Sequence, residues 1–183
     1  MKGAKMNAQI ITNPYECCPE YETAKFKLRL VSPADADDLL ECYSDRAAVT
    51  RMNADSCTSD FYYQSREEMD SCIKFWLDAY TAGHFVRFSV VDKSNSKAVG
   101  TVEIFGGNAG VLRIDLASTY ETGENIKELT ELAIDRFIRD FAVGKLMVKS
   151  GHTPERRKVF EQLGFTASKT FRPGMGYFEY AAD

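Results

Sequence analysis

Three short segments in the middle of the chain alternate between apolar and polar residues. Their apolar positions are, in chain order, Val86, Phe88 and Val90, then Val102 and Ile104, then Leu112, Ile114 and Leu116. Such alternation is typical of strands that bury one face. Short polar or glycine-rich turns at 92–97 and 106–108 separate the segments. The three strands are therefore predicted to form an antiparallel meander.

Helical patterns precede and follow this meander. Ser65 and Glu68 have the spacing of a capping box. The apolar residues behind them recur at helical intervals: Met69, Cys72, Ile73, Trp76, Leu77 and Tyr80. A long helix is predicted over 124–142, with Ile126, Leu129, Ala133, Phe137 and Phe141 facing inward. Ser32-Pro33 and Thr153-Pro154 each place an N-cap before proline and begin shorter helices.

The remaining segments complete the predicted order β-α-α-β-β-β-α-β-α-β-β. Alternation predicts a first strand at 26–30, and further strands are expected at 146–150 and in a hairpin over 167–180. Residues 45–64 are interpreted as a loop. Residues 1–22 are predicted to be an N-terminal extension, and 23–183 a single α/β domain. Its sheet is expected to be mixed but mostly antiparallel, with about seven strands and about four helices.

Composition narrows the classes of partner. The chain has 183 residues, a net charge of −4 and no long basic run, so a nucleic-acid partner is not expected. The longest basic cluster, Arg156-Arg157-Lys158, is interpreted as a solvated helix face, with a grip on a ligand phosphate as the alternative. No segment approaches the ~20 apolar residues of a membrane span, and the apolar stretch at 8–11 is too short for a signal peptide. We therefore expect a cytoplasmic protein.

The five cysteines and two histidines show no metal-site or nucleophile spacing. An odd number of cysteines without Cys-x-x-Cys pairs predicts free thiols, with Cys72 in the core. The adjacent Cys17 and Cys18 are interpreted as bystanders, with a redox role as the alternative. His84 and His152 are expected to be surface or structural residues. No metal is predicted.

The element order resembles that of the GCN5-related N-acetyltransferase superfamily. The runs VGTVEIF (99–105) and GVLRIDLASTY (110–120) look like the third and fourth strands of that family. KVFEQLGF (158–165) looks like its helix ending in Leu-Gly-Phe. KFKLRLVSPADADDLLECYSD (25–45) is similar to the opening of the ribosomal-protein and small-molecule acetyltransferase branch. The resemblance covers residues 23–183 and implies an acetyl-CoA-dependent N-acetyltransferase.

The resemblance also implies where the co-substrate binds. In this fold two central strands diverge after the fourth strand, and the pantetheine arm of CoA pairs with the exposed edge like an added strand. The next helix directs its N-terminus at the diphosphate. The corresponding cofactor-binding residues here are Leu116, Ala117, Gly123, Glu124, Asn125, Ile126 and Thr153. The loop expected to bind the diphosphate, 121–126, contains glutamates at 121 and 124. Phe160 stands where many members of the family have tyrosine.

The resemblance suggests catalytic residues as well. Glu103 is the first candidate for the general base; the alternative is a strand residue paired with lysine or arginine. Asp115 is the second candidate, although an ion pair with Arg113 is favoured. Tyr177 is a candidate acid or a hairpin core residue. Tyr120 precedes the phosphate loop and is expected to pack. The acceptor pocket is expected between 46–64 and 171–177.

Two functions are therefore carried forward. The first is transfer of an acetyl group to a primary amine, on a small molecule or a peptide N-terminus. The alternative is a catalytically impaired protein of this fold that senses acyl-CoA or binds another protein. A homodimer that pairs through the last strands is also predicted.

Overall fold

The computed structural model describes residues 13–54, 59–149 and 153–181. Its strands are β1 Tyr21–Glu22, β2 Phe26–Leu30, β3 Val86–Asp92, β4 Ala98–Phe105, β5 Ala109–Leu116, β6 Lys145–Lys149, β7 Thr166–Ala167 and β8 Tyr177–Ala181. Its α-helices are α1 Ala36–Tyr43, α2 Arg46–Asn53, α3 Arg66–Thr81, α4 Gly123–Leu132, α5 Ile138–Asp140 and α6 Pro154–Gln162. A π-helical segment, Ala133–Phe137, joins α4 to α5.

All of these strands form one mixed sheet in the order β1-β2-β3-β4-β5-β6-β8-β7. The meander β3-β4-β5 is antiparallel, as predicted. The one parallel pairing joins β5 to β6. The expected α/β class with a mostly antiparallel sheet is confirmed, with one strand more than predicted. The added strand is β1, where Tyr21 pairs with Leu28.

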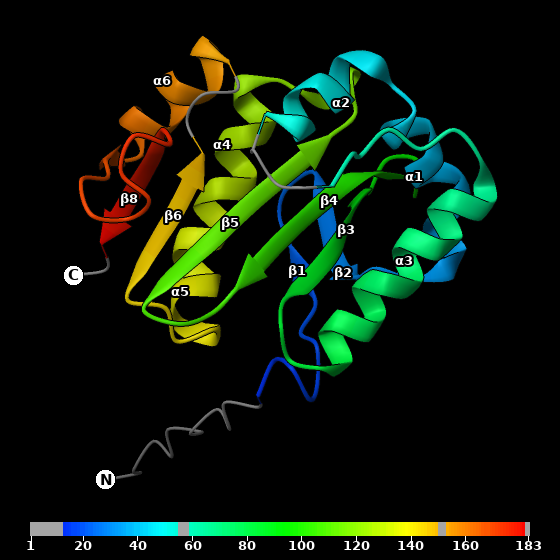
Figure 1. Cartoon of the computed structure of the whole chain (residues 1–183), viewed down its shortest axis with the longest axis horizontal. Helices are drawn as coiled ribbons and strands as arrows, with labels where there is room; N and C mark the ends of the chain where they lie inside the picture. The colour runs from blue at the N-terminus through cyan, green and yellow to red at the C-terminus, as the bar shows by residue number, and fades with distance from the viewer. Residues whose placement is uncertain (1–12, 55–58, 150–152, 182–183) are drawn as a thin grey trace, which may run out of the picture.

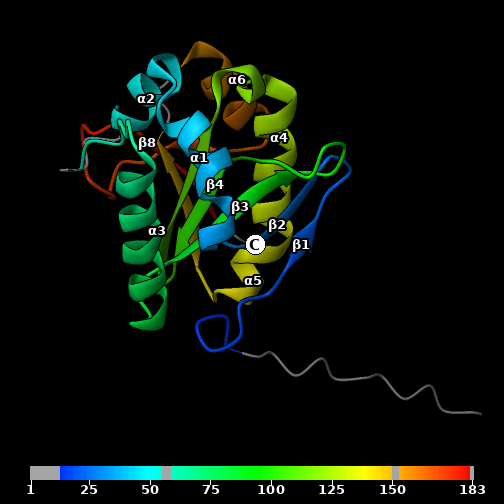
Figure 2. The same cartoon turned by 90° about the vertical axis from the view of Figure 1, so that its right-hand side faces the viewer.

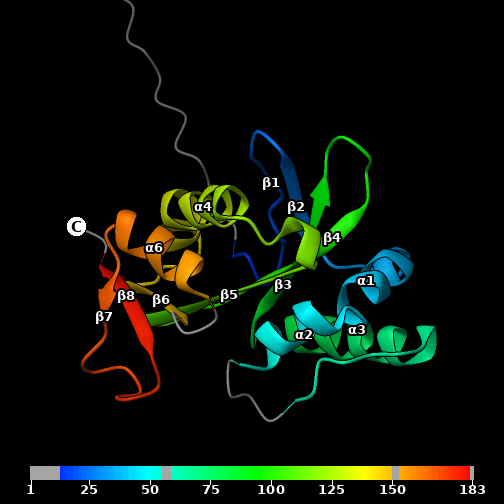
Figure 3. The same ribbon diagram turned by 90° about the horizontal axis from the view of Figure 1, so that it is seen from above.

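Helices cover both faces of the sheet (Figures 2 and 3). The helices α4 and α6 lie on one face, and α1, α2 and α3 lie on the other. The α4 side holds the larger apolar core, in which the ring of Phe137 stacks on that of Phe88 with centroids 5.4 Å apart. The second core holds Tyr43, Trp76 and Cys72, which confirms that Cys72 is a core residue.

The segment 45–64 contains a helix that we did not predict. Asp45 caps α2, because its carboxylate accepts hydrogen bonds from the backbone N–H groups of Ala47 and Ala48. The buried residues Val49 and Met52 give the helix an apolar side. The stripe is short and interrupted by polar residues, so periodicity alone does not reveal it.

The sheet divides where β5 and β6 separate. Their pairing begins at Ala109 with Lys145 and ends at Leu112 with Val148, whereas β5 continues to Leu116. Figure 1 shows the two strands diverging toward their C-terminal ends, with α4 at the opening. We call this opening the β5–β6 gap.

Gly100 provides a test of how tightly β4 and β5 approach each other. A Cβ atom at this position would lie 2.1 Å from the carbonyl oxygen of Asp115. We expect Gly100→Ala to lower the free energy of unfolding by about 3 kcal/mol, measured by urea denaturation. Gly107→Ala is the control, because a Cβ there meets nothing within 4 Å at φ +106° and should cost about 1 kcal/mol. Equal losses in the two variants would contradict this packing argument.

Candidate functional site

A buried polar cluster lies on the sheet face that α1, α2 and α3 cover. Residues two apart on a strand share a face, and the register places Arg87 beside Glu103, and Glu103 beside Arg113. Thr101 and Asp115 form the next pair along β4 and β5. The cluster therefore spans three neighbouring strands.

Arg87 is the centre of this cluster. Its Nε donates to Glu103 Oε2 over 3.0 Å, and its Nη2 donates to the same oxygen. Its Nη1 donates to Tyr43 Oη and Thr101 Oγ1, both at 3.1 Å. Burial alone would lower the pKa of Arg87, but Glu103, Tyr43 and Asp115 together outweigh burial and raise the pKa. The guanidinium therefore stays charged within the fold.

Glu103 is paired with Arg87, which is the alternative to a catalytic role given above. The two functions are compatible in space, because 12% of the Glu103 side chain remains exposed while Arg87 is 3% exposed. Asp115 is 3% exposed and accepts a hydrogen bond from Arg113 Nε over 2.7 Å. Burial opposes the charged form of Asp115, but Arg113 and Arg87 outweigh it and lower its pKa. Asp115 thus forms the predicted ion pair.

An aromatic pocket opens onto Glu103. Its volume is about 190 Å³, and its lining includes Glu103, Arg87, Arg113 and the aromatic side chains Phe61, Tyr63, Phe75, Trp76 and Phe85. The Arg87 guanidinium lies 4.3 Å from the centroid of Trp76, and that of Arg113 lies 4.2 Å from Phe61. These cation–π contacts hold both guanidinium groups against the walls.

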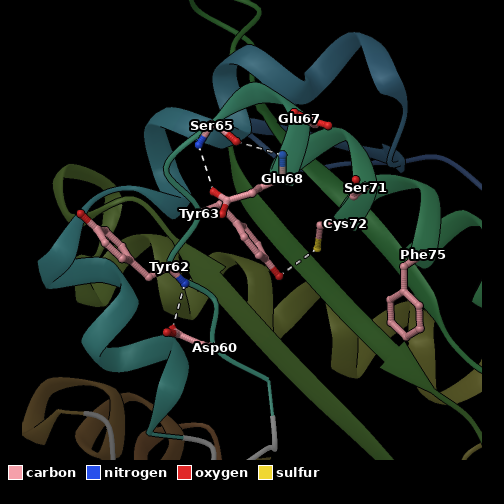
Figure 4. A pocket seen from close by; sticks show the side chains of 9 residues that line it. All are labelled: Asp60, Tyr62, Tyr63, Ser65, Glu67, Glu68, Ser71, Cys72 and Phe75. Carbon is pink, nitrogen blue, oxygen red and sulfur yellow. Dashed lines mark hydrogen bonds between the residues drawn. The ribbon is translucent and has the colours of Figure 1, made fainter.

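A wider groove adjoins this pocket (Figure 4). The two share Tyr63, Cys72 and Phe75, and the groove has a volume of about 780 Å³. Cys72 Sγ donates to Tyr63 Oη over 3.1 Å at their junction. The rim carries the carboxylates of Asp60, Glu67 and Glu68. A ligand that enters along the groove therefore passes acidic groups before it reaches Glu103.

Tyr177 lies on the far side of the β5–β6 gap from Glu103. It pairs in register with Lys149 of β6, and its ring packs edge-on against Phe171 with centroids 5.0 Å apart. Three strand spacings separate β4 from β8, so Glu103 and Tyr177 are at least about 14 Å apart. Tyr177 is 7% exposed, which fits the expected core residue. The two candidates are therefore not brought into contact.

Of the two cofactor-binding residues predicted at the end of β5, Leu116 faces the gap and Ala117 does not. Ala117 N–H donates to the Val99 carbonyl over 3.0 Å, so it is directed toward β4. Alternation then directs the backbone groups of Ile114 and Leu116 toward the gap. The strand geometry suits an added strand at Ile114 and Leu116, but not at Ala117.

The N-terminus of α4 is already occupied by other parts of this chain. Thr122 caps the helix, accepting from Asn125 N–H at its Oγ1 and from Ile126 N–H at its carbonyl. Gly123 N–H donates to Glu155 Oε1 over 2.9 Å. Asn125 is 2% exposed, and its side chain donates to the Tyr120 carbonyl. Glu124 is exposed. These residues lie where the resemblance puts the diphosphate, yet their amides are mostly engaged.

Arg156 occupies the gap itself. It is 5% exposed, and its Nη2 donates to the Ile114 carbonyl over 2.9 Å. It also forms a two-pronged ion pair with Glu121, with contacts of 2.5 and 2.8 Å. The prediction of a solvated face is therefore wrong for Arg156, because the carboxylate of Glu121, in the loop before α4, provides its partner. Among the described residues, Arg156 and Glu121 therefore lie in the β5–β6 gap.

The other predicted residues have ordinary structural contacts. Thr153 Oγ1 caps α6 by accepting from Arg156 N–H, and Phe160 is buried. Tyr120 packs as expected and also donates to Asp92 Oδ2 over 2.8 Å. His84 is exposed, and His152 lies outside the described residues.

The described part of the chain also bears on the expected absences. Cys17, Cys18, Cys42 and Cys72 are free thiols. Among the residues described, no three His, Cys, Asp or Glu side chains gather as a metal site would require. No described helix is both long and apolar enough to span a bilayer.

Comparison with solved structures identifies the architecture. A GCN5-related N-acetyltransferase from Brucella melitensis superposes with a TM-score of 0.68 at 13% identity, covering 89% of this chain and 78% of that one. RimL, a ribosomal alpha-N-protein acetyltransferase in complex with coenzyme A, superposes with a TM-score of 0.66 at 11% identity, covering 90% and 99%. The chain has the GCN5-related N-acetyltransferase fold.

A GNAT-family acetyltransferase from Bacillus anthracis shows the same likeness, with a TM-score of 0.67 at 12% identity over 89% of this chain and 98% of that one. No protein-family model matches the sequence. No curated protein is significantly similar to it. The likeness therefore concerns the arrangement of the backbone.

Sequence reasoning did not anticipate Arg87 as a site residue, and it considered Arg156 only in the alternative role of gripping a ligand phosphate. The sequence does contain an indication that Arg87 is buried. Arg87 alternates with Val86 and Phe88 on a strand whose polar positions also include Ser89. Every residue of β3 is buried, so its polar face lies under helices and needs internal partners. The signal for Arg156 is weaker, since its partner Glu121 lies 35 residues away.

The Asp115 ion pairs predict a pH-dependent stability. Its pKa in the folded state is below the ordinary 3.8, so its stabilising contribution is present above pH ~4 and lost as pH falls through the folded pKa. Asp115→Asn should lower the free energy of unfolding by about 3 kcal/mol at pH 7. The difference from the wild type should shrink toward pH 3.

Urea denaturation at several pH values measures this difference. Asp37→Asn is the control, because the Asp37 side chain is 81% exposed, and it should change stability by less than about 0.5 kcal/mol. A difference for Asp115→Asn that stays constant from pH 7 to pH 3 would show that the carboxylate is not held in its charged form.

Proposed function

We propose that this chain is an acetyl-CoA-dependent N-acetyltransferase that acts on a primary amine, on a small molecule or a peptide N-terminus. One observation carries the proposal: the Glu103 carboxylate of β4 lines the aromatic pocket beside Arg113 of β5, the strand that borders the β5–β6 gap. In this fold the gap is where an acyl-CoA supplies its thioester. Amine and thioester would therefore meet at β5.

The pocket has the chemistry that an amine nucleophile requires. An amine attacks only in its neutral form, so its proton must pass to a base directly or through water. Among the described residues that line the pocket, Glu103 provides a carboxylate. Arg87 and Arg113 hold the carboxylates of Glu103 and Asp115 at the inner end of the pocket.

Tyr177 has a less direct part in this proposal. It lies beyond β6, on the other side of the gap. As an acid it would have to donate a proton to a leaving thiolate from that side. Its edge-on contact with Phe171 and the Lys149 ammonium 5.2 Å from its ring centroid position the ring.

A second candidate function has its own supporting observation. The ion pair of Arg156 with Glu121 lies in the β5–β6 gap, and Glu155 binds the N-terminus of α4. Glu103 is bound by Arg87. Such an arrangement suits a protein of this fold that does not catalyse and serves as an acyl-CoA sensor or a protein-interaction module. Location in the cytoplasm, the domain division at 22/23 and a homodimer through the last strands stay predictions.

Isothermal titration calorimetry with acetyl-CoA and with CoA tests the co-substrate, and assays with a panel of primary amines test turnover. We expect binding in the micromolar range and acetylation of at least one amine. The absence of binding at high micromolar concentration would contradict the enzyme. Binding without turnover of any amine would support the sensor instead.

Glu103→Gln tests the base. We expect kcat to fall by at least about 100-fold, because the amide cannot accept the proton, while acetyl-CoA affinity is unchanged. Glu67→Gln is the matched control on the exposed rim of the groove and should keep kcat within about 2-fold of the wild type. Circular dichroism confirms folding, since Glu103 also pairs with Arg87. An unchanged rate would remove Glu103 from the mechanism.

A further inference from the structure

The first turn of α6 places two charged side chains at the β5–β6 gap. Arg156 reaches the β5 edge, and Glu155 reaches the N-terminus of α4. Neither contact stabilises α6 itself, whose cap is Thr153. The two residues therefore connect α6 to the elements that would bind CoA.

Arg156 takes the hydrogen bond that an added strand would use. The Ile114 carbonyl faces the gap, and its oxygen accepts from Arg156 Nη2 over 2.9 Å. A cavity whose lining includes Ile114, Val148 and Arg156 retains about 10 Å³, which is at most the space for one water molecule. A pantetheine arm cannot lie along Ile114 while the guanidinium remains there.

Glu155 takes the anion position at the helix N-terminus. A helix N-terminus attracts negative charge through its unpaired N–H groups. Here Gly123 N–H donates to the Glu155 carboxylate over 2.9 Å. The Cβ of any other residue at 123 would lie 3.0 Å from that oxygen. A carboxylate from this chain therefore lies where a phosphate would dock.

Glu121 holds Arg156 in the closed position. The side chains of this pair are 6% and 9% exposed, and both carboxylate oxygens accept from the guanidinium. Arg51 Nε lies 3.7 Å from the same carboxylate and holds it from the other side. The Glu121 side chain is thus fixed by two arginines.

We propose that Glu121, Arg156 and Glu155 form an internal plug that closes the β5–β6 gap. CoA binds when the Arg156 side chain breaks its contacts with Glu121 and Ile114. The proposal rests on the proposed function for the identity of the ligand. The plug uses the same two interactions as the ligand, a hydrogen bond to the β5 edge and an anion at the α4 N-terminus. The plug and CoA therefore exclude each other, and the plug weakens binding.

Calorimetric titration with CoA tests the plug by binding, without an activity assay. Glu121→Gln keeps the shape of the side chain but removes the charge that holds Arg156. We expect its Kd for CoA to be at least 10-fold lower than that of the wild type. Glu161→Gln is the matched control, because it removes one carboxylate from the Arg157–Glu161 pair, which is exposed on the same helix. Its Kd should stay within about 2-fold of the wild-type value.

Glu155→Gln is a second variant, and it does not threaten folding because Glu155 is exposed. We expect it also to bind CoA more tightly than the wild type. In a crystal structure of Glu121→Gln with CoA, Arg156 should no longer contact the Ile114 carbonyl. A CoA complex that retains the contacts of Arg156 with both Glu121 and Ile114 would overturn the plug.

The outcomes separate the plug from the proposed function. Binding to Glu121→Gln but not to the wild type supports the plug and contradicts CoA as the wild-type co-substrate. Wild-type binding that Glu121→Gln and Glu155→Gln do not tighten supports the co-substrate and overturns the plug. No binding to any of the three proteins overturns both.

Discussion

The hydrogen bonds and ion pairs of the buried Arg87 guanidinium organise the sheet face that α1, α2 and α3 cover. The guanidinium lies near the middle of the sheet and joins α1 to β4 and β5 through Tyr43, Thr101, Glu103 and Asp115. A buried arginine without such partners would be strongly destabilising. Its position therefore determines where the carboxylates of β4 and β5 lie. The aromatic pocket takes its shape from the same group, because Trp76 packs against it.

The backbone was more predictable than the site. Alternation located the meander, and the capping box at Ser65 and Glu68 is present in the structure. These features depend on neighbouring residues, so a single sequence contains them. The helix α2 is not predicted from the sequence, because its start depends on one side-chain cap and its apolar face is short. The extra strand β1 has two residues, too few to show alternation.

The site depends on pairs that are distant in sequence. Glu103 was recognised on a strand, but its partner Arg87 lies 16 residues away on another strand. A glutamate at position 121 disfavours a bound diphosphate, because like charges repel. Its pairing with Arg156 explains how the fold tolerates that glutamate, because a buried positive charge neutralises it. Charge partners across such separations follow from topology, which local patterns do not specify.

The first turn of α6 has a consequence for kinetics. Glu155 and Arg156 are adjacent residues, and each is bound to a different element, α4 and β5. A displacement of this turn large enough to break one contact strains the other. Opening should therefore be concerted and slow compared with the rotation of an isolated side chain. Association with CoA would then approach a maximum rate at high ligand concentration, set by the rate at which the turn moves.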